Sequence, residues 1–166
     1  MSDSRTSSGV LGSRGVLATR GVVFMHCCPS ALAPHVEWAL AGVLERPARL
    51  QWTGQPAAPS HLRAEAAWTG PIGTAAALCA ALRAWPMLVF EVTEDATSAS
   101  DGERLAYVPG RGFHRSLVSV SGDVLVGEER LRGLLTRSRT VEEYQHGVAE
   151  LLGTACLLYT SDAADE

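Results

Sequence analysis

The sequence of 166 residues contains no lysine and no asparagine. Without lysine, the chain cannot form a Schiff base or use a lysine as general base. Arginine therefore supplies every side-chain cation other than histidine. We attribute both absences to a GC-rich coding sequence, because lysine and asparagine codons are rich in A.

Basic stripes and long apolar runs are also missing. The formal net charge is -4, whereas nucleic-acid binding usually needs a basic surface that displaces counterions from phosphates. No run approaches the roughly 20 apolar residues that span a bilayer, and the first 20 residues lack the apolar segment of a secretory signal. Two of the four cysteines are adjacent, which does not suggest a disulfide framework. We expect a cytoplasmic protein that binds neither nucleic acid nor membrane.

Both ends differ in composition from the rest of the chain. Residues 1–18 are rich in Ser, Gly and Arg without periodicity, which predicts a disordered lead-in, and Val16 could be the true start. The ending CLLYTSDAADE resembles translated sequencing-adapter read-through. We therefore expect residues 154–166 to be a non-native tail, and a single domain over residues 19–153.

The first part of that domain shows two hydrophobic periods. Helical spacing predicts helices at Leu32–Val43 and Thr74–Trp85, and apolar runs or alternation predict strands at Gly21–His26, Arg49–Thr53, Leu62–Trp68 and Met87–Thr93. The order strand, helix, strand, strand, helix, strand is that of a ferredoxin-like βαββαβ core. The predicted class is α+β.

The second part predicts a β-hairpin and two more helices. The hairpin joins Arg104–Val108 to Phe113–Ser121 through a Pro-Gly-Arg-Gly turn, and the helices run over Glu128–Ser138 and Val141–Leu152. The last helix is preceded by a Thr-x-x-Glu capping box. We expect these elements to extend the sheet of the core or to cover its free face.

Several phrases of the chain carry a family resemblance. They are RGVVFMH…PSALAPHVEWALAGVL, LQWTGQPAAP, TAAALCAALRAW…FEVTED, SDGERLAYVPGRGFHRS and GDVLVGEERLRGLL. Together they resemble an uncharacterised actinobacterial family, domain of unknown function 3145 (DUF3145), over roughly residues 19–153. The resemblance implies a small, cytoplasmic protein and brings no activity with it. Other members tend to have small residues in place of Cys27 and Cys28.

A first candidate site lies where the first strand meets the first helix. His26, Cys27, Cys28 and His35 are potential metal ligands, but zinc sites normally separate paired cysteines by two to four residues. We therefore predict packing and no metal there. His26, His35 and Glu37 could instead gather around a small anionic ligand at the helix N-terminus, or could belong to a segment explained by packing.

A second candidate lies on the predicted hairpin and the loop before it. Asp101, Glu103, Arg104 and His114 bring carboxylates, a guanidinium group and an imidazole to a region of tight turns. His114 with Asp101 or Glu103 could act as an acid–base pair. Salt bridges on a solvated hairpin are the alternative explanation.

A third group is the polar face of the predicted sheet. Arg49, Gln51, Arg63, Glu65 and Glu91 fall on it, and cross-strand Arg–Glu pairs would account for most of them without a ligand.

We expect a non-catalytic module that binds a small ligand or a protein partner, and that forms a homodimer through a sheet surface. The alternative is a small acid–base enzyme that uses His114 or His35 with a nearby carboxylate. No cofactor-binding motif is present: the chain has no glycine-rich phosphate loop, Rossmann fingerprint or nucleophile elbow.

Overall fold

A computed structural model describes residues 18–153 of the chain. Residues 1–17 and 154–166 lie outside this range. The first segment holds the predicted lead-in except Ala18, and the second is the predicted non-native tail. The strands are β1 (Ala18–Pro29), β2 (Thr53–Gly54), β3 (His61–Pro71), β4 (Val89–Glu94), β5 (Gly102–Val108), β6 (Gly112–Val118) and β7 (Val124–Leu125). The helices are a 3-10 turn (Ser30–Leu32), α1 (Ala33–Leu44), α2 (Thr74–Leu82), α3 (Glu128–Arg137) and α4 (Val141–Leu152).

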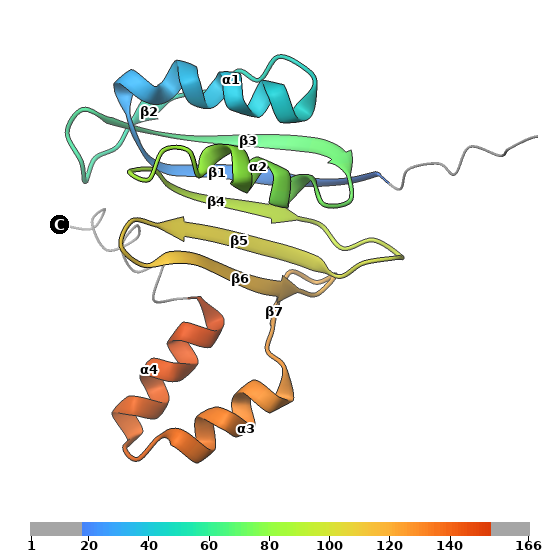
Figure 1. Cartoon of the computed structure of the whole chain (residues 1–166), viewed down its shortest axis with the longest axis vertical. Helices are drawn as coiled ribbons and strands as arrows, with labels where there is room; N and C mark the ends of the chain where they lie inside the picture. The colour runs from blue at the N-terminus through green and yellow to red at the C-terminus, as the bar shows by residue number, and fades with distance from the viewer. Residues whose placement is uncertain (1–17, 154–166) are drawn as a thin grey trace, which may run out of the picture.

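The strands form one antiparallel sheet in the order β2-β3-β1-β4-β5-β6-β7. This architecture confirms the predicted α+β class. The hairpin β5–β6 pairs with β4, so it extends the sheet and does not cover its free face. The result is seven strands side by side, beyond the four of the predicted core (Figure 1).

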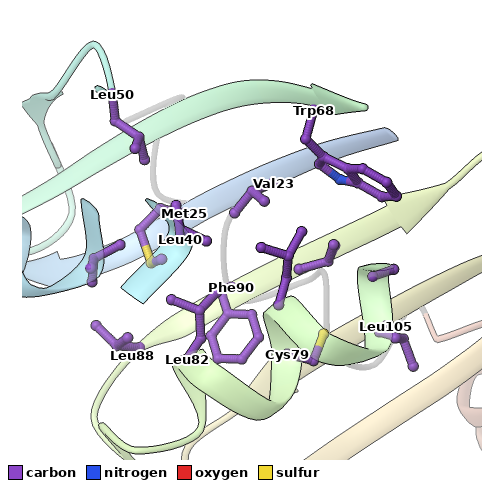
Figure 2. Packing of buried hydrophobic residues seen from close by; sticks show 14 of the residues in the cluster. Val23, Met25, Leu40, Leu50, Trp68, Cys79, Leu82, Leu88, Phe90 and Leu105 are labelled. Atoms are coloured by element: carbon purple, nitrogen blue, oxygen red, sulfur yellow. The ribbon is translucent and has the colours of Figure 1, made fainter. Parts of the chain in front are cut away.

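The hydrophobic core lies between this sheet and the first two helices. Figure 1 shows α1 and α2 together over one face of the sheet. Side chains alternate between the faces of a strand, so every second residue of β1 from Thr19 to Met25 is buried. Figure 2 shows part of this packing, with Val23, Met25, Leu40, Trp68, Leu82, Leu88 and Phe90 labelled. The largest fully buried side chains are Val23, Met25, Cys28, Val36, Leu40, Trp68, Leu78, Leu82, Leu88, Phe90 and Val92.

Strand β1 is longer than the sequence predicts. It passes through a β-bulge between Met25 and Cys28 and stays paired until Pro29 lies opposite His61 of β3. A bulge inserts an unpaired residue and breaks the alternation on which the predicted end depended. His26 therefore lies inside the strand and not at its carboxyl end.

The predicted strand Arg49–Thr53 is wrong except for its last residue. The Leu50 N–H donates to the Glu37 carboxylate at 2.9 Å, and the Trp52 indole N–H donates to the same oxygen at 3.0 Å. These bonds tie the segment to α1, and its ladder pairing with β3 begins only at Thr53. Its alternating pattern thus reflects one side packed on a helix.

Helix α2 ends three residues before the predicted Trp85. The Ala84 and Trp85 N–H groups bond to carbonyls three residues back, so the chain leaves the α-helix in a tighter turn. The residue before a proline is disfavoured in α-helical conformation, and Pro86 follows directly.

Helices α3 and α4 form a hairpin beyond the β6–β7 edge, away from α1 and α2 (Figure 1). Leu134 is the one large side chain buried there. It packs against Gly147, where even a methyl group would collide with it. The predicted capping box is present in a shifted form: Thr140 accepts from the Glu143 N–H at 3.2 Å, while Glu143 accepts from the Arg139 N–H at 2.7 Å.

Candidate functional site

The face of the sheet that α1 and α2 leave uncovered, here called the open face, carries the polar side chains of the sheet. Antiparallel partners share a face, so the register places them together: Phe24 lies opposite both Glu65 and Glu91, and Ala106 lies between Glu91 and His114. The open face thus includes Phe24, His26, Arg63, Glu65, Glu91, Arg104, His114 and Ser116.

An ion pair between β4 and β5 forms the centre of the open face. The Arg104 guanidinium donates from Nε and Nη2 to the two oxygens of Glu91, both at 2.8 Å. Only 6% of Glu91 is exposed. Burial raises the pKa of Glu91, but contacts with His26 and Arg104 outweigh burial and hold that pKa below its usual value. The Glu91 carboxylate is therefore ionised, and both of its oxygens are bonded to Arg104.

His26 lies beside this pair. Its Nε2 is 3.9 Å from Oε2 of Glu91, beyond hydrogen-bond distance, and this buried nitrogen has no hydrogen-bond partner among residues 18–153. The ring stacks on Phe24 with centroids 6.2 Å apart. Buried polar atoms are nearly always hydrogen-bonded, and among the described residues the only other buried side-chain nitrogen without a partner is Nε1 of Trp68.

A hollow of about 390 Å³ opens between His26 and the outer strands. It lies over β1 and β3, and the chain from Gln51 to Gln55 forms its rim. Arg63 and Glu65 project from β3 on the same side, and within the described residues neither has a side-chain hydrogen bond or ion pair. The lining residues are Phe24, Met25, His26, Gln51, Thr53, Gln55, Arg63, Ala64 and Glu65.

A second hollow, of about 500 Å³, lies where β4 ends and β5 begins. Its charged groups already have partners in the structure. Arg20 pairs with Asp95 at 2.9 Å, and Arg104 pairs with Glu91. Glu94 accepts from two backbone N–H groups at the start of α2. This hollow therefore offers a ligand few free charges.

The predicted group of His26, His35 and Glu37 is not brought together. His26 lies on the open face, whereas His35 is exposed on α1, with its ring 6.4 Å from that of Trp85. Glu37 binds the Leu50 N–H and the Trp52 indole, so its carboxylate has a structural role. The sheet lies between the two histidines.

The second predicted group is divided by strand alternation. Glu103 lies on the helix side of the sheet and pairs with Arg115 at 2.6 Å, while Arg104 faces the open side. Asp101 is exposed before β5 begins. Of this group, the open face holds only Arg104 and His114.

His114 lies near the β6 edge of the open face. Its Nε2 is 2.8 Å from the hydroxyl of the buried Ser116, and no carboxylate of the described residues forms an ion pair with it. Burial lowers the pKa of His114, and the positive charges of Arg130 and Arg104 lower it further. His114 thus favours the neutral form and lacks the carboxylate that an acid–base pair would need.

Strand β4 contains two buried glutamates, of which the sequence analysis identifies only Glu91 as a candidate. Glu91 and Glu94 are both less than a tenth exposed and point to opposite faces of β4. The carboxylate of Glu94 accepts from the Gly73 N–H at 2.8 Å and the Ala75 N–H at 2.9 Å, satisfying the start of α2. The signal was available: two acids in a six-residue apolar strand need partners if the strand is buried.

The cysteines are free thiols where the structure describes them. Burial raises the pKa of Cys28 to about 11 and that of Cys79 to about 12, which keeps both thiols protonated. Within residues 18–153 no three His, Cys, Asp or Glu side chains gather as metal ligands would.

Comparisons with known proteins gave one match. A family model described as a protein of unknown function, DUF3145, matches residues 22–157, which is most of the chain. No curated protein and no solved structure matched.

Proposed function

The chain belongs to the DUF3145 family, and we propose that it is a non-catalytic binding module that holds a small ligand in the open-face hollow beside β1 and β3. One observation carries this proposal. Arg63 and Glu65, which have no side-chain hydrogen bond or ion pair among the described residues, line a single hollow of about 390 Å³ together with His26, whose Nε2 has no hydrogen-bond partner there. That volume is at the small end of the range for ligand sites.

The charges of the hollow define the class of ligand. Arg63 presents a guanidinium group, which suits a carboxylate, and Glu65 two positions away presents an acceptor for an ammonium group. Gln51 and Thr53 add neutral hydrogen-bonding groups at the rim. We propose that the ligand is a small zwitterion of the amino-acid class.

Binding is favoured over catalysis by the placement of the histidines. His114 and His35 lie on opposite sides of the sheet, and neither forms an ion pair with a carboxylate of the described residues. General acid–base catalysis requires such groups within hydrogen-bond reach of one reacting centre. No observation favours the enzyme alternative.

The proposal includes a ferredoxin-like topology for the elements from β1 to β4. In support, α1 leads from β1 to β2 while β3 lies between them, and α2 leads from β3 to β4 while β1 lies between them. We also propose a cytoplasmic location, which the free thiols support. None of the helices in residues 18–153 is long and apolar enough to cross a membrane.

Titration of the full-length protein with single amino acids, followed by amide NMR, tests the ligand proposal. We expect at least one amino acid to shift the signals of residues 24–26 and 61–65. Its N-acetyl and methyl-ester derivatives, which lack the ammonium or carboxylate charge, should bind more weakly.

Matched variants assign the two charges. Arg63→Gln and Glu65→Gln should each weaken binding about tenfold or more, because each removes a charged hydrogen bond. Arg83→Gln and Glu45→Gln, both exposed and outside the hollow, should leave it unchanged. The proposal fails if no amino acid shifts these signals at about 10 mM, a concentration well above the range of specific affinities, or if the Arg63 and Glu65 variants bind like the wild type.

A further inference from the structure

A third hollow, of about 320 Å³, lies beside β3 on the side of the sheet that α1 covers. It is lined by residues 46–50, which follow α1, by residues 66–68 of β3, and by Val23, Leu40 and Leu44. It shares no lining residue with the open-face hollow, so the two can hold different ligands. We call it the helix-side hollow.

Apolar side chains make up most of the lining of the helix-side hollow. Val23, Leu40, Leu50 and Trp68, which Figure 2 shows in the packing of the core, are each less than a tenth exposed. Leu44 is half-buried and packs against the same core. An apolar group that enters the hollow therefore leaves water for an apolar surface, which favours its binding.

The polar side chains of this lining can only donate hydrogen bonds. They are the guanidinium groups of Arg46 and Arg49 and the indole N–H of Trp68. Both arginines are exposed, and among residues 18–153 neither has a side-chain hydrogen bond or ion pair. No acidic side chain lines the hollow, and Glu45, the neighbour of Arg46 in the sequence, lies outside it. Charge complementarity therefore favours an anion there.

We propose that the helix-side hollow binds a small amphipathic carboxylate. Its apolar chain lies against Leu40, Leu44 and Trp68, and its carboxylate pairs with Arg46 and Arg49. A guanidinium group suits this role, because it can bind a carboxylate through two parallel hydrogen bonds. The volume is at the small end of the range for ligand sites, so the ligand is a short- or medium-chain acid and not a long-chain lipid. This site does not depend on the amino-acid site proposed for the open face.

Titration of the full-length protein with sodium hexanoate, followed by amide NMR, tests this site. We expect saturable shifts that are largest in residues 44–50 and 66–68, and small in Gln55 and Arg63 of the open-face hollow. Hexanol has the same chain without the charge, and acetate has the charge without the chain. Each should bind about tenfold more weakly or worse, because each loses either the charged hydrogen bonds or the apolar contact.

Arginine variants assign the charge. The double variant Arg46→Gln with Arg49→Gln should weaken hexanoate binding about tenfold or more. Arg83→Gln, an exposed arginine outside the hollow, is the matched control and should leave binding unchanged. The proposal is overturned if about 10 mM hexanoate, above the usual limit of weak specific binding, shifts no signal of residues 44–50 and 66–68. It is also overturned if hexanol binds as tightly as hexanoate, or if the double variant binds like the wild type.

Discussion

The two pairs of helices in this molecule are similar in length but differ in what holds them. Helices α1 and α2 are apolar and lie on the sheet, where Val36, Leu40, Leu78 and Leu82 are almost fully buried. Helices α3 and α4 alternate apolar and charged residues and bury Leu134 alone among their large side chains. The first pair is held by packing on the sheet, whereas the second buries little, with Leu134 against Gly147 and Gly153 beside His114.

The starts of α2 and α4 show a related difference. Neither α1 nor α2 has a side-chain cap from its own N-cap residue, and the first N–H groups of α2 bond to Glu94 of β4. Helix α4 has Thr140 as its cap, and both α3 and α4 place two acids in the first turn. Acids there complement the helix dipole. Helix α2 thus takes its cap from the sheet, whereas α4 takes its cap from its own sequence.

A matched pair of leucine substitutions tests this contrast most strongly. Leu82→Ala should lower the free energy of unfolding by about 3 to 4 kcal/mol, because it leaves a cavity in the core. Leu135→Ala should cost less than about 1 kcal/mol, because Leu135 is mostly exposed. Chemical denaturation would measure both free energies of unfolding. Equal costs for the two substitutions would contradict the contrast.

Two ion pairs extend the comparison to the sheet. Arg104→Gln leaves Glu91 buried without its charged partner, and should cost about 3 kcal/mol. Arg115→Gln breaks the pair with Glu103, in which the arginine is 65% exposed, and should cost about 1 kcal/mol or less. The same denaturation experiment ranks them. A larger loss of stability in Arg115→Gln than in Arg104→Gln would contradict the greater contribution of the buried Glu91–Arg104 pair.

The smallest effect is the dependence of stability on acid pH. The pKa of Glu91 is lower in the folded chain than the ordinary value of 4.5, so near that pH the unfolded state binds more protons. The contribution of Glu91 to stability is therefore complete above about pH 4.5 and is lost as the pH falls through the folded pKa. Glu91→Gln should be less stable than the wild type at pH 7 but should lose less stability between pH 5 and pH 3. If stability falls equally with pH in both proteins between pH 5 and pH 3, Glu91 does not contribute to the acid dependence.

The sequence predicts the types of the main elements well, because their patterns are strong and local. The helical spacing of α1 and the alternation in β3 come from burial on one side, which periodicity detects. The continuation of β1 past His26 depends on pairing with β3 and β4 through a bulge, and this pairing leaves no local pattern. The segment before Thr53 shows alternation without being a strand, since it packs on α1.

The candidate site was predictable only in part. The polar sheet face with Arg63, Glu65 and Glu91 follows from alternation, and these residues do share the open face. The partner of Glu91 does not follow, because Arg104 belongs to a strand whose place in the sheet is set by tertiary pairing. Neighbours in sequence, such as Glu103 and Arg104, look like one cluster until the pleat sends them to opposite faces.

The position of β1 in the sheet has a consequence for how the chain is made. It is the first strand of residues 18–153 to be synthesised, yet it lies between β3 and β4, so its second edge stays unpaired until Val89–Glu94 has been translated. Pairings across such sequence separations form slowly, and an unpaired strand edge invites association with other chains. During synthesis, the strand that joins the two halves of the sheet is therefore the one most exposed to misassembly.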